Sequence, residues 1–310
     1  MTLEFGVHLP LVDFGDVPRT LTRMSTYVSE AAALGYDYVC ANDHLVFAKA
    51  WMDGPAALAA VLHACADLTI ATTVALPVLR GPAQTASLFA ALHTLSGGRL
   101  VAGVGPGSSA ADFAAAGVPF AERWKRFDES VRVLRVLLGK DPAPFQGTFY
   151  SAETPREPLT AGTTSPPLWI ASWGSPAGSR RAAALGDGWL ASAYNSSPEA
   201  FRITLERFER AGRPAATFPN AMATTWLHVT DRPQDARRIV EDVLAPMLNR
   251  PVDDPQLRGL PIGSAEECAE RLTAYAEAGA QRFFLWPVGD EVDQITAFRS
   301  QVMPLLASAG

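Results

Sequence analysis

The sequence predicts an α/β protein in which eight parallel strands and the helices between them close into a (β/α)₈ barrel, the TIM barrel, with short insertions. Short β-rich segments alternate with long amphipathic ones along the whole chain, which is typical of parallel βα units. Eight such units suit a chain of 310 residues, because a barrel of this class takes about 250 residues before insertions. No linker or internal repeat interrupts the pattern, so residues 1–310 are expected to form one domain.

The strand candidates are short runs of aliphatic, aromatic and β-branched residues bounded by turn-forming residues. In chain order they are Glu4–Leu9, Tyr38–Ala41, Thr69–Leu76, Leu100–Gly105, Leu168–Ser172, Gly188–Ala193, Ala223–Val229 and Arg282–Trp286.

The helix candidates carry apolar residues at spacings of three and four, which places these residues on one buried stripe. Gly35 and Gly279 are suited to left-handed C-caps, and Ser264 with Glu267 fits a capping box. The predicted helices are Leu21–Leu34, Ala83–Leu95, Phe127–Leu138, Gly178–Leu185, Glu199–Ala211, Ala236–Leu248, Ala265–Ala278 and Ile295–Leu306.

Two stretches read as insertions into this pattern, Gly139–Pro167 and Arg250–Pro261. The first contains PFQGTFYS, which can pair as a small hairpin. Both can be ordinary loops, but on a barrel such loops often help to cover the site.

Composition excludes several classes of protein. Hydrophobic residues make up 48% of the chain and charged residues 19%, which allows a large core. The net charge is −6 without any basic run, which argues against a nucleic-acid partner. No segment reaches the roughly 18 apolar residues of a membrane span, and the N-terminus has no signal-peptide core, so a cytoplasmic protein is expected. Cys40, Cys65 and Cys268 are far apart and odd in number, which favours buried thiols over disulfides or zinc ligation.

Polar and aromatic residues follow the predicted strands, where barrels of this class carry their active sites. A pocket ringed by indoles with a few polar groups suits a flat, conjugated ligand. The candidate pocket residues for a small-molecule substrate are His8, Trp51, Trp173, Tyr194 and Trp286.

His44 is the best candidate for an acid or base, because imidazole titrates near neutral pH. The adjoining Asp43 could set its tautomer, although neighbouring strand residues point to opposite sides. The alternative for His44 is that it is a half-buried histidine with a structural role. His63 and His93 lie in helical patterns and are expected to be structural, and His228 could be either.

A metal-dependent barrel hydrolase built on His8, Asp43, His44 and His228 is the alternative from another enzyme class. No HxH or HExxH spacing supports it, so no metal site is predicted.

Small residues at 172–179 (SWGSPAGS) connect the fifth strand to a helix. Such residues expose backbone N–H groups, and a helix start adds the positive end of its dipole, so the segment suits a phosphate. A plain turn is the alternative. At 103–107 (GVGPG) we expect the backbone around Gly105 to approach a ligand ring, with a tight turn as the alternative.

Several of these stretches resemble the bacterial-luciferase-like family of flavin- and deazaflavin-dependent oxidoreductases, in order and across nearly the whole chain. The Ser-Gly-Gly-Arg and Pro-Phe-x-Glu-Arg elements are the most specific. The similar stretches are GYDYVCANDHLV, TIATTVALPVLRGP, LHTLSGGRLVAGVGPG, GVPFAERWKRFDESVRVLR, PLWIASWGSP, ALGDGW and GSAEECAERLTAYAEAGAQRFFLWP.

The resemblance implies a cofactor at the carboxyl-terminal mouth of the barrel. His44 falls at the family's acid/base or substrate-contacting histidine, and Thr73-Val74 falls where members often have a non-prolyl cis peptide behind the cofactor ring. Some deazaflavin dehydrogenases carry a glutamate after the fourth strand, where we align Pro106, which argues against a sugar-phosphate dehydrogenase. The phosphate loop falls on Gly174, Ser175, Pro176, Ala177, Gly178 and Ser179.

The leading hypothesis is therefore an oxidoreductase that uses a reduced flavin-type cofactor, coenzyme F420 or FMN, for hydride transfer or monooxygenation of a small organic substrate. The rarity of Lys and abundance of Ala indicate GC-rich coding, which favours F420 by association. A non-catalytic flavin-binding protein is the remaining alternative, since a fold does not guarantee turnover. The family resemblance also makes a homodimer possible, because dimers are common among its members.

Overall fold

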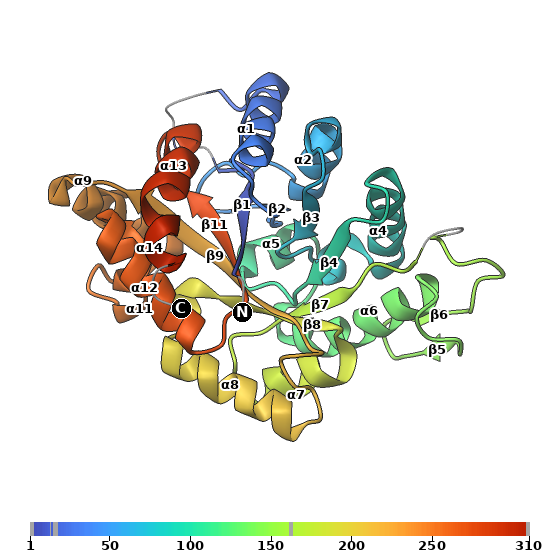
Figure 1. Cartoon of the computed structure of the whole chain (residues 1–310). Coiled ribbons are helices and arrows are strands. Elements are labelled where there is room, and N and C mark those ends of the chain that lie inside the picture. Colours follow the sequence, from blue (N-terminus) through green and yellow to red (C-terminus); the bar gives the residue numbers. More distant parts are fainter. Residues whose placement is uncertain (1–2, 13, 15–17, 161–163, 308–310) are drawn as a thin grey trace.

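The computed structural model describes residues 3–12, 14, 18–160 and 164–307. Its main sheet is a closed ring of eight parallel strands, because β9 pairs with both β11 and β8. Helices surround this ring on its outside (Figure 1), which confirms the predicted (β/α)₈ barrel. The ring strands are β1 (Glu4–His8), β2 (Tyr38–Ala41), β3 (Thr69–Thr72), β4 (Leu100–Val104), β7 (Leu168–Ala171), β8 (Gly188–Ser192), β9 (Asn220–Val229) and β11 (Arg282–Pro287).

Four short helices were not predicted. Three of them, α2 (Gly54–Val61), α3 (Pro77–Arg80) and α5 (Ala110–Ala115), lie in the connections after β2, β3 and β4, and the fourth, α11 (Pro255–Arg258), lies in the second insertion. The segments predicted as single helices over 236–248 and 295–306 each contain a π-helical stretch, Ile239–Leu244 and Phe298–Val302. The helices are α1 (Leu21–Ala33), α2 (Gly54–Val61), α3 (Pro77–Arg80), α4 (Pro82–Leu95), α5 (Ala110–Ala115), α6 (Arg123–Leu137), α7 (Pro176–Leu185), α8 (Pro198–Arg210), α9 (Pro233–Arg238), α10 (Ala245–Leu248), α11 (Pro255–Arg258), α12 (Ala265–Glu277), α13 (Glu291–Ala297) and α14 (Met303–Ala307).

Local sequence signals explain where several helices begin. Ser175 and Ser197 cap α7 and α8 by accepting hydrogen bonds from Gly178 N and Ala200 N. Ser264 and Glu267 form the predicted capping box of α12. The predicted third strand is shorter than expected, because the chain leaves the sheet at Thr73 and Pro77 begins α3.

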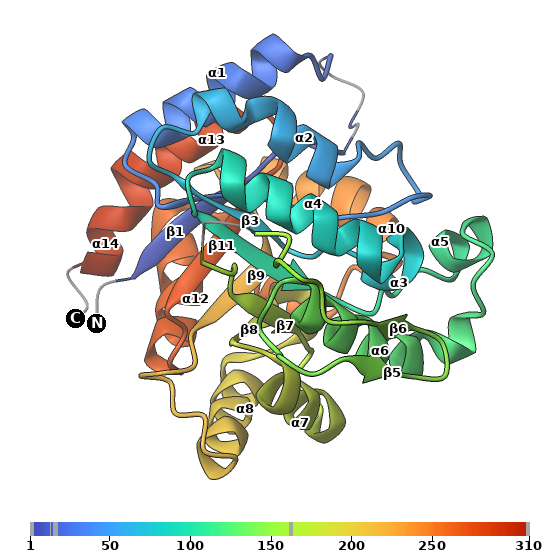
Figure 2. The ribbon, with the colours of Figure 1, turned by 90° about the vertical axis from the view of Figure 1, so that its right-hand side faces the viewer.

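The first insertion contains the predicted hairpin, formed by β5 (Phe145–Gln146) and β6 (Ser151–Ala152). It lies against α6 (Figure 2), where the Glu129 carboxylate accepts hydrogen bonds from the backbone N–H groups of Thr148, Phe149 and Tyr150. In the second insertion the chain forms α11, and directly after it the two-residue strand β10 (Ile262–Gly263) pairs with β9.

The barrel interior is filled by side chains below the mouth. The largest are Trp169, Phe284 and Tyr38, which pack with small residues of the other strands. Gly6 is needed there, because a methyl group on it would lie 2.6 Å from Tyr38 Cβ. The barrel is thus a packed core and not an open channel.

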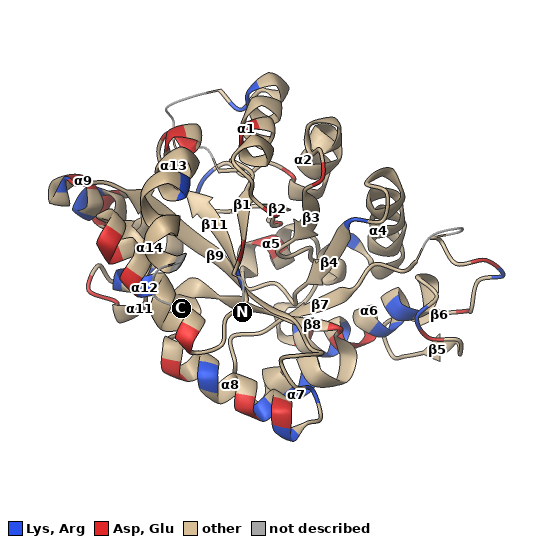
Figure 3. Ribbon diagram, in the orientation of Figure 1, with Lys and Arg blue, Asp and Glu red and all other residues tan. Residues whose placement is uncertain are grey.

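The outer surface carries charges of both signs, as α8 shows in Figure 3. On α8, Arg202 and Arg210 both pair with Glu206 at helical spacings of four. Cys40, Cys65 and Cys268 are free and buried, as predicted. Within the described residues, no helix has the length and apolar character needed to cross a bilayer.

Candidate functional site

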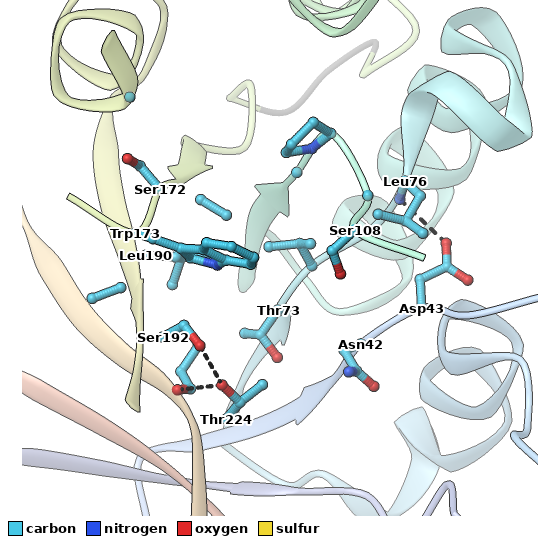
Figure 4. A pocket seen from close by; sticks show the side chains of 18 of the residues that line it. Asn42, Asp43, Thr73, Leu76, Ser108, Ser172, Trp173, Leu190, Ser192 and Thr224 are labelled. Carbon is cyan, nitrogen blue, oxygen red and sulfur yellow. Dashed lines mark hydrogen bonds between the residues drawn. The ribbon is translucent and has the colours of Figure 1, made fainter. Parts of the chain in front are cut away.

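A cavity of about 290 Å³ opens at the carboxyl ends of the strands. Six strands, β2, β3, β4, β7, β8 and β9, or the segments directly after them, line it (Figure 4). The ends of β1 and β11 supply none of the lining residues among those described. The cavity therefore lies to one side of the barrel mouth.

The cavity collects many of the site residues predicted from sequence. Those that line it are Asp43, His44, Thr73, Val74, Gly105, Trp173, Ser175, Gly178 and Tyr194. Those that do not are His8, Trp51, Gly174, Pro176, Ala177, Ser179 and Trp286. The chemical roles assigned to them stay predictions.

His44 lies just beyond β2 at the cavity wall, and its side chain is 14% exposed. Its Nδ1 lies 2.7 Å from Asp112 Oδ2. The rings of Phe47 and Trp51 pack against the imidazole, with centroids 4.4 and 4.6 Å away. The imidazole is therefore held in one orientation by a carboxylate and two aromatic rings.

The prediction that Asp43 orients His44 is wrong. The Asp43 carboxylate binds the Arg80 guanidinium and accepts a hydrogen bond from Leu76 N at 3.2 Å. Consecutive residues of an extended chain point to opposite sides, so Asp43 and His44 have different partners. The carboxylate that holds His44 is Asp112, from α5.

The connection from β7 to α7, where the sequence predicts an anion site, is a tight turn of small residues that leads into the N-terminus of α7. Ser175 accepts a hydrogen bond from Gly178 N at 3.1 Å, and Ser172 Oγ accepts one from Gly174 N at 3.2 Å. A side chain at position 178 has no space, since a methyl group there would lie 2.1 Å from Ser172 Oγ. Gly174 has φ +82°, which glycine adopts most readily. Ser179 faces inward, and its Oγ donates to the Ser175 carbonyl oxygen at 2.9 Å.

A cationic side chain, Arg123, also lines the cavity. Its guanidinium carbon lies 3.9 Å from the centroid of Phe120 and 5.5 Å from that of Trp124. In the described part of the chain, no carboxylate forms an ion pair with Arg123. Arg181 of α7 lies 4.7 Å from the centroid of the same Trp124 ring. The cavity therefore offers a cation, Arg123, close to α7.

Val74 and Gly105 are neighbours in the cavity wall. The peptide bond between Thr73 and Val74 is cis, as the family resemblance implied. Gly105 lies so close that a methyl group on it would be 2.7 Å from Val74 Cγ2. Trp173 is 58% exposed, and its indole points into the space between Leu190 and Ser108 (Figure 4).

A bulge in β9 adds a hydroxyl group to the wall. The pairing of β9 with β11 shifts register between Phe283 and Leu285, and Thr224 has φ +52°. Its Oγ1 lies 3.2 Å from Ser192 Oγ at the cavity (Figure 4). Bulges commonly redirect a side chain in this way.

Three predicted pocket residues belong instead to an aromatic cluster beside the cavity. Trp286 stacks between His8 and Trp226, with both centroid distances 4.2 Å, and Trp51 meets it edge-on. Large rings that pack on one another leave no room for a ligand. His8 is fully buried, and burial lowers its pKa to about 3. His8 is therefore a neutral packing residue, whose Nε2 lies 3.1 Å from Thr73 Oγ1.

The residues of the alternative metal hydrolase do not converge. His8 contacts Thr73, Asp43 binds Arg80, His44 binds Asp112, and His228 Nδ1 lies 2.7 Å from the Val288 carbonyl oxygen. The described residues contain no group of three or more His, Cys, Asp or Glu side chains arranged to hold a metal ion.

Sequence reasoning missed several residues of the cavity. Asp112 is brought to His44 by a short helix that hydrophobic spacing did not reveal, although Ser109 three residues earlier is its N-cap. The only sequence signal at Arg123 is its place in the Pro-Phe-x-Glu-Arg motif. Ser108, Ser192 and Thr224 carry no sequence signal beyond their places after or within strands.

Residues 4–257 match the family model of luciferase-like monooxygenases. The chain belongs to this family. Among its relatives, the F420-dependent glucose-6-phosphate dehydrogenase of Amycolatopsis mediterranei (strain U-32) is 25% identical, with 99% of this chain and 100% of that protein covered. The F420-dependent hydroxymycolic acid dehydrogenase of Mycobacterium tuberculosis (strain ATCC 25618 / H37Rv) is 26% identical over 92% of this chain and 84% of that protein.

A solved structure shares the luciferase-like fold. The F420-dependent secondary alcohol dehydrogenase in complex with an F420-acetone adduct superposes with a TM-score of 0.80. It is 22% identical, and the match covers 99% of both chains.

The residues of the cavity fit the ring-and-phosphate cofactors of the luciferase-like family. The buried Asn42 Oδ1 has no hydrogen-bond partner among the described residues, and a ring N–H group could satisfy it. Gly105 leaves the wall beside Val74 flat enough for a planar ring. Ser175 and Gly178 at the N-terminus of α7 line the cavity together with Arg123, and helix N-termini and guanidinium groups commonly bind phosphates.

Proposed function

We propose that this chain is a two-electron oxidoreductase that binds coenzyme F420, with its phosphate at the N-terminus of α7 and its ring against Val74 and Gly105. The observation that carries the proposal is that the α7 N-terminus, the Gly105 wall and His44 face one cavity. The cofactor supplies hydride chemistry when bound. The protein binds and orients it, limits access of water and moves a proton through His44.

F420 is proposed in preference to FMN because the relatives that cover nearly the whole chain are F420-dependent dehydrogenases. The test is to titrate the purified protein with F420 and with FMN. F420 is expected to bind at least about tenfold more tightly, which corresponds to about 1.4 kcal/mol. Equal affinity, or tighter binding of FMN, would contradict this choice.

The substrate is proposed to be a small secondary alcohol or ketone without a phosphate group. The Asp43 charge is neutralised by Arg80, and Arg123 lies on the side assigned to the cofactor phosphate. The remaining wall is formed by hydroxyl groups and by apolar side chains such as Trp173 and Leu190.

Activity is tested by oxidation of reduced F420 with acetone, cyclohexanone and related ketones, and by reduction of F420 with the matching alcohols. Glucose 6-phosphate is the comparison, because it is the substrate in the name of one relative. A member of the ketone panel is expected to react, and glucose 6-phosphate is not. Reaction with glucose 6-phosphate alone would contradict the proposed substrate class.

The cytoplasm is the proposed compartment, because the three buried cysteines remain free thiols. A homodimer is proposed from the family resemblance, and the sedimentation velocity of the purified protein will test it. No nucleic-acid partner is proposed, since the net charge is −6.

A further inference from the structure

Burial and hydrogen bonds fix the orientation of the Asp112 side chain. It is 1% exposed and lies in the first turn of α5, where its N–H donates to Ser109 Oγ at 3.2 Å. Its Oδ1 accepts hydrogen bonds from Val46 N at 2.7 Å and Leu45 N at 3.1 Å. The other oxygen, Oδ2, is left facing His44 Nδ1 at 2.7 Å.

This arrangement dictates which nitrogen of His44 carries the proton. An ionised carboxylate only accepts hydrogen bonds, so a hydrogen bond between Asp112 and Nδ1 requires a proton on Nδ1. Neutral imidazole carries one N–H, and Nε2 must then hold a lone pair. Within the described residues, Nε2 has no hydrogen-bond partner, and His44 lines the cavity.

We propose that Asp112 is the positioning residue of the reaction: it fixes His44 in the Nδ1–H tautomer, so that Nε2 exchanges the proton with the substrate oxygen. The substrate step rests on the proposed function, whereas the tautomer does not depend on any cofactor. In alcohol oxidation, the substrate O–H bond breaks and its proton forms an N–H bond at Nε2. The hydrogen on carbon leaves as hydride with its electron pair to oxidised F420, and a carbonyl group and imidazolium remain.

Asp112→Asn separates this role from a purely structural one. Because Oδ1 of residue 112 accepts two backbone N–H groups, the asparagine carbonyl oxygen is expected to take that place and keep the loop after β2. Its NH₂ group then faces His44 Nδ1 as a donor. Nδ1 must become an acceptor, and the proton moves to Nε2.

The experiment is NMR of protein with ¹⁵N-labelled imidazole rings, recorded without cofactor at alkaline pH, where the ring is neutral. The five histidines are few enough for His44 to be assigned by comparison with His44→Gln. Wild-type protein is expected to show the Nδ1–H tautomer at His44, and Asp112→Asn the Nε2–H tautomer. Ser109→Ala, which removes only the N-cap of α5, is the control: it is expected to lower the melting temperature and leave the tautomer unchanged.

The same variants are then compared in reduction of F420 with the best alcohol of the panel, the direction in which Nε2 must accept a proton. Asp112→Asn is expected to lower kcat by about 10²- to 10⁴-fold, while KM for the alcohol and Kd for F420 change less than about twofold. Ser109→Ala is expected to retain kcat.

An Nε2–H tautomer in wild-type protein would overturn the proposal, and so would a wild-type kcat in an Asp112→Asn protein with an inverted tautomer. Absence of F420 binding by wild-type protein with the Nδ1–H tautomer would instead overturn the proposed function and leave the assignment of the tautomer supported.

Discussion

Arg80 holds Asp43 through two nitrogens at once: Nε donates to Oδ2 at 2.5 Å and Nη2 to Oδ1 at 2.7 Å. The pair joins α3 to the segment after β2, whose Asp43 lines the cavity. Hydrogen bonding to Asp43 raises the pKa of Arg80, so the guanidinium stays charged. The Asp43 side chain is 1% exposed, whereas Asp53, which also binds Arg80, is 45% exposed.

Asp43→Asn is therefore expected to lower the free energy of unfolding by about 2–3 kcal/mol, because it leaves a partly buried guanidinium without its main partner. The matched control is Asp53→Asn, which keeps the N-cap of α2 and is expected to cost less than about 1 kcal/mol. Urea denaturation measures both. Equal losses would show that burial of the Asp43 pair does not matter.

Ser175→Asp tests the anion site at α7. Aspartate is as good an N-cap as serine, so the fold should remain, while the new charge repels a phosphate at close range. We expect the Kd for F420 to rise about tenfold or more, and the rise to shrink at high salt. The control Ser175→Asn keeps an N-cap residue without adding a charge, so its Kd for F420 should be close to that of the wild-type protein. If both variants bind equally well, the phosphate lies elsewhere.

Gly105→Ala tests the flat wall, because its methyl group would lie 2.7 Å from Val74 Cγ2. Val74 must then shift, and we expect F420 to bind about tenfold more weakly. Shortening the neighbour in Gly105→Ala/Val74→Ala should restore most of the affinity, since the clash is removed. Titrations of the two single variants and the double variant measure this coupling, and purely additive effects would argue against the contact.

His8 predicts a pH dependence of stability. Its pKa is about 3 in the folded protein, because of burial, and about 6.5 in an unfolded chain. Below pH 6.5 the unfolded state therefore binds the proton more readily, and stability falls as the pH drops from 6.5 toward 3.

At pH 5 the loss of stability assigned to His8 is about 2 kcal/mol. His8→Gln should remove this part of the difference in unfolding free energy between pH 7 and pH 5. His63→Gln, at an exposed position, is the control and should retain it. An unchanged pH slope in His8→Gln would show that His8 is not responsible.

The strands and longer helices could be predicted from sequence because each depends on local information. β2 begins and ends where the pattern placed it, at Tyr38 and Ala41, and the capping box at Ser264 marks the start of α12. The π-helical stretches after Arg238 and Ala297 could not be predicted, since hydrophobic spacing does not distinguish them from a regular helix. The short α5 could not be predicted either, because only two of its residues are buried and they show no helical periodicity of apolar residues.

The sequence by itself determined the order of βα units, the family, and which strand ends deliver polar residues to the barrel mouth. Only the tertiary structure decided which of those side chains meet. Asp43 and His44 are neighbours in the chain, yet they bind Arg80 and Asp112, which lie 37 and 68 positions away. The sequence predicts Trp286 and His8 as pocket residues, but in the structure their rings stack on each other. The reason is physical: strand and helix signals are local, whereas the partner of a buried side chain is set by whichever residues the closed barrel brings beside it.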